Sequence, residues 1–118
     1  MQPRDRLFLQ HIREAITEIA AFTTGGRAEF MADSKTQSAV IRQLEVIGEA
    51  VKNLSPDLTR REPAVPWRLI AGTRDRLIHA YFQVDRDAVW SMVEQDLPPL
   101  RVQVERLLAD PPQEPADG

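Results

Sequence analysis

VIRQLEVIGEAVKNL, residues 40–54, is the stretch of sequence that decides the fold class. Apolar side chains recur in it at spacings of four, three, four and three, at Val40, Leu44, Ile47, Val51 and Leu54. On a helix of about 3.6 residues per turn this spacing forms one apolar stripe. The pattern therefore predicts an amphipathic helix from about Ser34 to Leu54, capped by Ser34 or Asp33 and ended by Ser55-Pro56.

Helical periodicity continues along the rest of the chain, and no segment alternates with the period of two that a strand requires. Further helices are predicted over about residues 4–23, 67–81 and 86–96, and a last one from a break at Pro98-Pro99 to about residue 108. Residues 27–33 are expected to form a loop or short turn, and residues 55–66 a polar connection. The sequence thus predicts one all-α domain over residues 1–109, a four- or five-helix up-and-down bundle. Residues 110–118, rich in proline and acids, are expected to be a disordered tail.

Composition excludes several classes of protein. The chain has 118 residues, a net charge of −3 and no cysteine, which rules out disulfides, thiolate metal sites and a cysteine nucleophile. We expect no signal peptide and no membrane span, hence a cytoplasmic protein. Residues 60–86 hold six arginines against three acids, a local charge of +3 that can meet a phosphate. A mixed solvated surface explains the same charges equally well.

The residues best suited to chemistry lie between Arg74 and Tyr81. Asp75 precedes His79 by four residues, so on a helix the carboxylate adjoins the imidazole, fixes its tautomer and favours its charged form. Arg74 and His79 are five residues apart, about 140° around a regular helix, and do not converge on one phosphate. Either the helix ends near His79, or a second subunit completes the site across a symmetric interface.

Weaker signals have ordinary structural explanations. His11 is expected to be a surface or boundary histidine, and Trp67 and Trp90 to be core or interface aromatics. Asp75 and His79 can also be an ordinary Asp–His pair on a surface helix, with no role in catalysis. No His-x-x-x-His pair, acidic loop or glycine-rich phosphate loop is present, so the sequence predicts neither a metal site nor a bound cofactor.

The order of motifs resembles that of the HepT-like ribonucleases of the HEPN superfamily, over roughly residues 4–108. The segment from Gln43 to Pro56 is similar to the family's second-helix signature, and Pro66-Trp67 to the start of its next helix. The motif Arg74-x-x-x-x-His79-x-Tyr81, with the polar Asp75, is similar to the family's active-site motif. Val84-Asp85 to Trp90 and the segment around Pro98-Pro99 resemble its closing parts.

The resemblance implies a homodimeric helical bundle with the motif at the subunit interface. It also implies a metal-independent endoribonuclease toxin that acts on RNA such as tRNA or mRNA. Arg74 and His79 would be catalytic, with Asp75 orienting His79. Its partner would be a minimal nucleotidyltransferase antitoxin that adds AMP to Tyr81.

Two other functions stay open on the residues alone. The chain can be a non-catalytic partner, or substrate-binding subunit, of a minimal nucleotidyltransferase, which the acidic net charge favours. It can also be a plain dimeric helical adaptor, for which substitutions of Arg74 and His79 would be silent.

Overall fold

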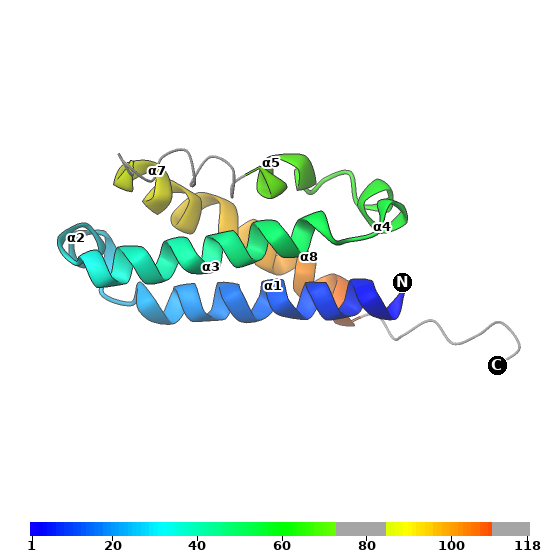
Figure 1. The fold of residues 1–118 in the computed structure, drawn as a ribbon, viewed down its shortest axis with the longest axis horizontal. Coiled ribbons are helices and arrows are strands. Elements are labelled where there is room, and N and C mark those ends of the chain that lie inside the picture. Colours follow the sequence, from blue (N-terminus) through cyan, green and yellow to red (C-terminus); the bar gives the residue numbers. More distant parts are fainter. Residues whose placement is uncertain (73–84, 110–118) are drawn as a thin grey trace, which may run out of the picture.

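A computed structural model of the chain describes residues 1–72 and 85–109, and these form an all-helical bundle without a β-strand (Figure 1). The two long helices α1 (Pro3–Phe22) and α3 (Ser34–Lys52) pack along each other. Helix α8 (Leu97–Ala109) packs on α1, and α5 (Trp67–Ala71) packs on α3. The predicted all-α class and the two long helices are confirmed.

One apolar core fills the space between these helices. The stripe predicted for α3 is buried at all five positions, and Gly48 is buried beside it. The buried apolar residues from the rest of the described chain are Leu9, Ile12, Ala15, Ile16, Ile19, Phe30, Ala50, Leu58, Val65, Trp67, Val89, Trp90, Leu97, Leu100, Val104, Leu107 and Leu108. Trp67 and Trp90 are thus core aromatics, as predicted.

The spacing of Phe8, Ile12, Ala15, Ile16, Ile19 and Phe22 predicts that these residues form one apolar stripe on α1. For Phe22 this prediction is wrong, because the residue is 41% exposed. Phe22 lies ten residues after Ile12, which rotates it about 80° from the centre of the buried face at 100° per residue. It also ends the helix, beyond the last buried residue of the stripe, Ile19. Phe22 is therefore exposed although its side chain is apolar, because it lies at the edge of the buried face of α1.

Two short helices occupy segments that were expected to be connections. Helix α2 (Gly26–Ala32) buries Phe30, and α4 (Pro56–Arg61) buries Leu58. The sequence does contain residues typical of a helix start at this point, because Ser55 caps α4 and Pro56 is its first residue. The polar connection predicted over 55–66 therefore contains a short helix that was not predicted.

The expected break at Pro98-Pro99 is also wrong. Helix α7 (Arg86–Ser91) continues through a π-helical turn, η1 (Met92–Asp96), directly into α8. The backbone N–H of Leu97 donates to the carbonyl of Met92, five residues earlier. Proline lacks an N–H and its ring clashes with the carbonyl four residues before it, so a wider turn just ahead of the prolines lets the helix continue.

Side-chain caps fix the helix ends. Asp33 caps α3, because its carboxylate accepts hydrogen bonds from the Lys35 backbone N–H at 3.0 Å and the Thr36 hydroxyl at 2.7 Å. The bond from Thr36, and then the one from Lys35, lower the pKa of Asp33 below its ordinary value of 3.8. Of the two caps predicted for this helix, the structure therefore uses Asp33.

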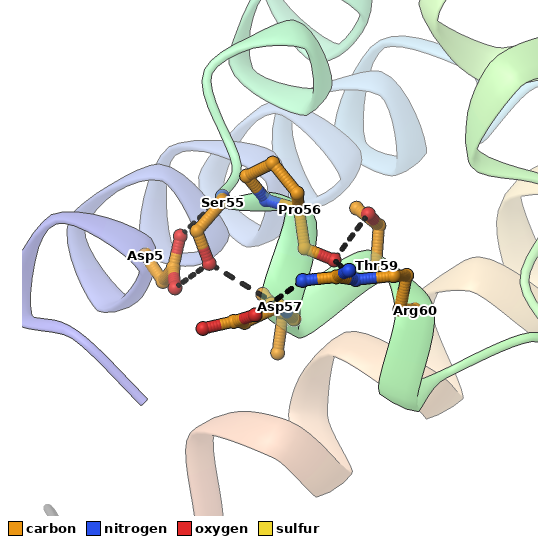
Figure 2. A network of polar contacts seen from close by, with 7 residues as sticks. Asp5, Ser55, Pro56, Asp57, Thr59 and Arg60 are labelled. Carbon is orange, nitrogen blue, oxygen red and sulfur yellow. Dashed lines mark hydrogen bonds and ion pairs between the residues drawn. The ribbon is translucent and has the colours of Figure 1, made fainter.

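Long-range polar contacts tie the ends of the helices together. Asp5, only 1% exposed on α1, accepts hydrogen bonds from the backbone N–H and the hydroxyl of Ser55, just before α4 (Figure 2). The guanidinium of Arg6 donates to the carbonyl of Leu108 at 3.0 Å, so α1 and the end of α8 are joined directly. Both contacts fix the N-terminal half of α1.

Candidate functional site

The predicted site residues Arg74, Asp75, His79 and Tyr81 lie outside the described residues. Their roles and their mutual geometry therefore stay predictions. The described structure gives the elements on either side of this segment, namely α5 before it and α7 after it.

The start of helix α5 is fixed by the burial and the hydrogen bond of Trp67. Trp67 is 8% exposed, and its indole N–H donates to the carbonyl of Glu62 at 3.0 Å. Pro66 precedes the helix, and the helix packs against α3. Trp67 therefore anchors the start of α5 in the core, and the exposed Pro66 lies directly before it.

Helix α7 is held by different neighbours. Its cap is Asp85, whose carboxylate accepts from the Ala88 backbone N–H at 3.1 Å. Trp90 packs on Phe30 of α2 with ring centroids 5.3 Å apart, and Asp87 pairs with Arg27 of the same helix. The chain on either side of the motif is thus anchored on two separate elements, α3 for α5 and α2 for α7.

An apolar cavity of about 210 Å³ lies beside α5. Leu44 and Ile47 of α3 line it together with Leu69 and Ile70 of α5, and residues of η1 and α8 complete it. Its polar lining consists of Gln95, Asp96 and Gln103. Among the described residues that line it there is one carboxylate and no histidine, so this part of the cavity suits an apolar group and holds no acid–base pair.

A second, shallower hollow of about 270 Å³ lies between α1 and α3, and its lining includes His11. His11 is exposed and meets Phe8 edge-on, with ring centroids 5.8 Å apart, so its prediction as a surface histidine is confirmed. Neither hollow was predicted, because each depends on the packing of helices far apart in sequence. Within residues 1–72 and 85–109, no group of three or more His, Cys, Asp or Glu side chains is placed to hold a metal ion.

Comparisons with known proteins define the class. The family profile described as "Ribonuclease HepT-like" matches residues 12–107. A probable ribonuclease HepT of Thermococcus cleftensis is 50% identical over 101 residues, 85% of this chain and 92% of that protein. A putative RNase of Methanocaldococcus jannaschii is 44% identical over 106 residues, 89% of this chain and 88% of that protein.

The chain therefore belongs to the HepT-like ribonuclease family. A putative RNase of Caldanaerobacter subterraneus subsp. tengcongensis is 38% identical over 104 residues, 87% of this chain and 93% of that protein. No solved structure matches the chain. In the part of the chain that the structure describes, no helix has the length and apolar character needed to cross a membrane.

Proposed function

We propose that this chain is the ribonuclease toxin of a toxin–antitoxin pair, a metal-independent endoribonuclease that cleaves RNA through Arg74 and His79. The observation that carries the proposal is the motif Arg74-x-x-x-x-His79-x-Tyr81, which lies within the range that matches the HepT-like family. The names of the relatives, probable ribonuclease HepT and putative RNase, support RNA as the substrate.

The proposed reaction uses the 2′-hydroxyl that RNA carries beside each phosphate. His79 takes the proton of this hydroxyl as its oxygen attacks the phosphorus, and the bond from phosphorus to the 5′ oxygen breaks. The leaving 5′ oxygen takes up a proton, which gives a 2′,3′-cyclic phosphate and a 5′-hydroxyl. Arg74 holds the non-bridging oxygens while negative charge builds on them, and Asp75 orients the imidazole.

Two copies of the motif suit this reaction better than one. Arg74 and His79 diverge by about 140° on a regular helix, so residues of two subunits can converge where those of one do not. Two histidines across a symmetric interface can also divide the roles of acid and base. We therefore propose that the active form is a homodimer with the motif at its interface.

Neutralisation is proposed to act on Tyr81. A nucleotidyltransferase antitoxin transfers AMP from ATP, so that a bond forms between the tyrosine oxygen and the α-phosphorus while pyrophosphate leaves. Arg74 and Tyr81 are seven residues apart, almost two turns of a regular helix, and on such a helix they would share a face. The added phosphate then neutralises the arginine and occupies the place of the RNA.

The experiment that tests the nuclease is cleavage of total tRNA by the purified wild type and by His79→Ala. The new 3′ ends are typed for cyclic phosphate, and intact mass establishes that Tyr81 is unmodified. Cleavage by the wild type alone supports the proposal. No cleavage by either folded protein contradicts it and favours the second candidate, a non-catalytic partner of a nucleotidyltransferase, which the net charge of −3 supports.

A further inference from the structure

The cavity beside α5 has the walls and the size to take one flat ring. Leu44 and Ile47 of α3, which line it, are buried, whereas Leu69 of α5 and Pro99 of α8 are exposed, so the cavity reaches the surface. Its volume of about 210 Å³ lies below the roughly 300–1,000 Å³ of pockets that hold drug-sized ligands. The cavity therefore suits a single ring system rather than a whole nucleotide.

One wall of the cavity carries two polar side chains on a single helical stretch. Asp96 ends η1, and Gln103 follows seven residues later on α8. At 100° and 1.5 Å per residue the two lie within about 20° of the same direction and about 10 Å apart along the axis. Pro99 and Leu100 lie between them and also line the cavity. The wall thus presents two polar groups separated by an apolar surface.

The surroundings of these two side chains decide which of them donates. The Oε1 atom of Gln103 accepts hydrogen bonds from Nε of Arg106 at 3.2 Å and from Nη2 at 3.1 Å. Because a guanidinium only donates, the amide nitrogen of Gln103 is left to donate elsewhere. Asp96 is exposed and has no hydrogen-bond or ion-pair partner within residues 1–72 and 85–109, and a carboxylate only accepts. The wall therefore offers one donor and one acceptor.

Guanine is the base whose edge complements this wall. Its O6 atom accepts, and the N1–H and the N2 amino group next to it both donate, so one carboxylate can accept from both. Adenine, cytosine and uracil each place an acceptor beside their donor, and a carboxylate repels that acceptor. Proteins recognise unpaired bases by such hydrogen bonds to the edge and by packing of side chains on the faces.

We propose that this cavity binds one unpaired guanine base of RNA, with Asp96 accepting from N1–H and the N2 amino group and Gln103 donating to O6. Apolar side chains of α3, α5 and α8 cover the faces of the ring. The inference rests on the proposed RNA substrate and gives it a base preference. Ile70 lines the cavity and precedes Arg74 by four residues, a length of chain that spans at most about 15 Å. The guanine is therefore expected within a few nucleotides of the cleaved bond.

The direct test is binding of 2′-O-methyl RNA hexamers, which lack the 2′-hydroxyl and cannot be cleaved. One hexamer has five uridines and a single guanosine, and two others carry adenosine or inosine in its place. Inosine lacks only the N2 amino group. By fluorescence anisotropy, the dissociation constant is expected to be at least about tenfold lower for guanosine than for adenosine, with inosine between them. An affinity for guanosine that equals that for adenosine or inosine would overturn the inference.

Two substitutions remove the base contacts and leave the core unchanged. Asp96→Asn keeps the size of the side chain but replaces one acceptor oxygen by a donor, and Gln103→Glu keeps the acceptor for Arg106 but removes the donor. Each is expected to reduce the preference for guanosine over adenosine to about twofold or less. Glu105→Gln is the matched control for Asp96→Asn, because it makes the same charge change at an exposed position of α8 that pairs with Arg101. Wild-type preference in Asp96→Asn would contradict the site.

Failure of this inference and failure of the nuclease give different results. A wild type that cleaves RNA but binds the guanosine and adenosine hexamers equally would overturn the guanine site alone. A wild type that prefers the guanosine hexamer through Asp96 but cleaves no RNA would support the guanine site and contradict the nuclease alone.

Discussion

The buried carboxylate of Asp5 is joined to Ser55, 50 residues later, by two hydrogen bonds, one from the backbone N–H at 2.7 Å and one from the hydroxyl at 2.6 Å. The same hydroxyl accepts from the Leu58 backbone N–H at 3.3 Å and so caps α4 (Figure 2). One carboxylate on α1 therefore organises the beginning of a helix that is distant in sequence.

Replacing this carboxylate is expected to destabilise the fold. Asp5→Ala removes the acceptor of two donors of the half-buried Ser55 and should lower the free energy of unfolding by about 1–3 kcal/mol. Ser55→Ala loses the hydroxyl bond and the cap, and should cost about 1–2 kcal/mol. Urea denaturation measures both, with the exposed Ser38→Ala as control. Because the two residues share one interaction, the double variant should cost less than the sum, and strict additivity would contradict the contact.

The cap of α3 predicts a dependence of stability on pH. The folded pKa of Asp33 lies below its ordinary value of 3.8, so its contribution is fully present above pH 3.8 and is lost as the pH falls through the folded pKa. Asp33→Asn keeps a capping oxygen but does not titrate. The difference in melting temperature between wild type and this variant should shrink in acid. A difference that is constant from neutral pH to pH 2 would contradict the assignment.

Gly26 is expected to resist substitution while its neighbour does not. Gly26 has φ of +83°, a conformation that L residues adopt at a cost of roughly 1–2 kcal/mol, although nothing lies within 4 Å of an added Cβ. At Gly25, whose φ is −77°, an added Cβ meets only the flexible Glu29 carboxylate. Gly26→Ala should therefore lower the melting temperature more than Gly25→Ala, and equal effects would show that the backbone at Gly26 is not strained.

Within the proposed nuclease, Asp75→Ala should weaken cleavage roughly tenfold or more without loss of the fold, because His79 loses the group that orients it. The pH–rate profile should also move to lower pH, since a neighbouring carboxylate favours the imidazolium. Asp57→Ala, at an exposed ion pair with Arg60, is the control. Full activity of the Asp75 variant would exclude the orienting role.

The variant Tyr81→Phe is expected to keep the toxicity of the protein but to lose its neutralisation by the antitoxin. The variant keeps Arg74 and His79 and should cleave RNA and arrest growth as the wild type does, but it lacks the oxygen that accepts AMP. Coexpression with the nucleotidyltransferase should therefore not rescue growth, and intact mass should show no added AMP. A variant that the antitoxin still silences by AMP transfer would place the modification elsewhere.

The long helices of this fold could be predicted because their evidence is local. The α3 stripe from Val40 to Leu54 is set by spacing within one segment, and all five of its residues are buried. Asp33 was predicted as one of two possible caps for the same reason. The start of α4 was equally local, in Ser55 and Pro56, and was missed because three prolines in 55–66 suggested a plain connection.

Other features depend on contacts between distant segments. The spacing of Phe22 suggested burial, but whether the edge of α1 is covered depends on other helices. Helix α7 continues into α8 through a π-helical turn that accommodates Pro98 and Pro99. No residue in 92–96 is typical of such a turn, so the turn could not be predicted from the sequence. The family was predicted from motifs at the right spacing and is confirmed, whereas the roles of Arg74, Asp75, His79 and Tyr81 remain predictions.

The bond from Arg6 to the carbonyl of Leu108 has a consequence for how the chain folds. It joins residues 102 positions apart, and α1 also packs on α8 along the core. Helical bundles usually fold fast because their contacts are local, but closing a loop of 102 residues carries a larger entropic cost. Because α1 is synthesised before α8, its apolar stripe is fully covered only after α8 has left the ribosome. We expect the docking of α8 to be the slow step of refolding.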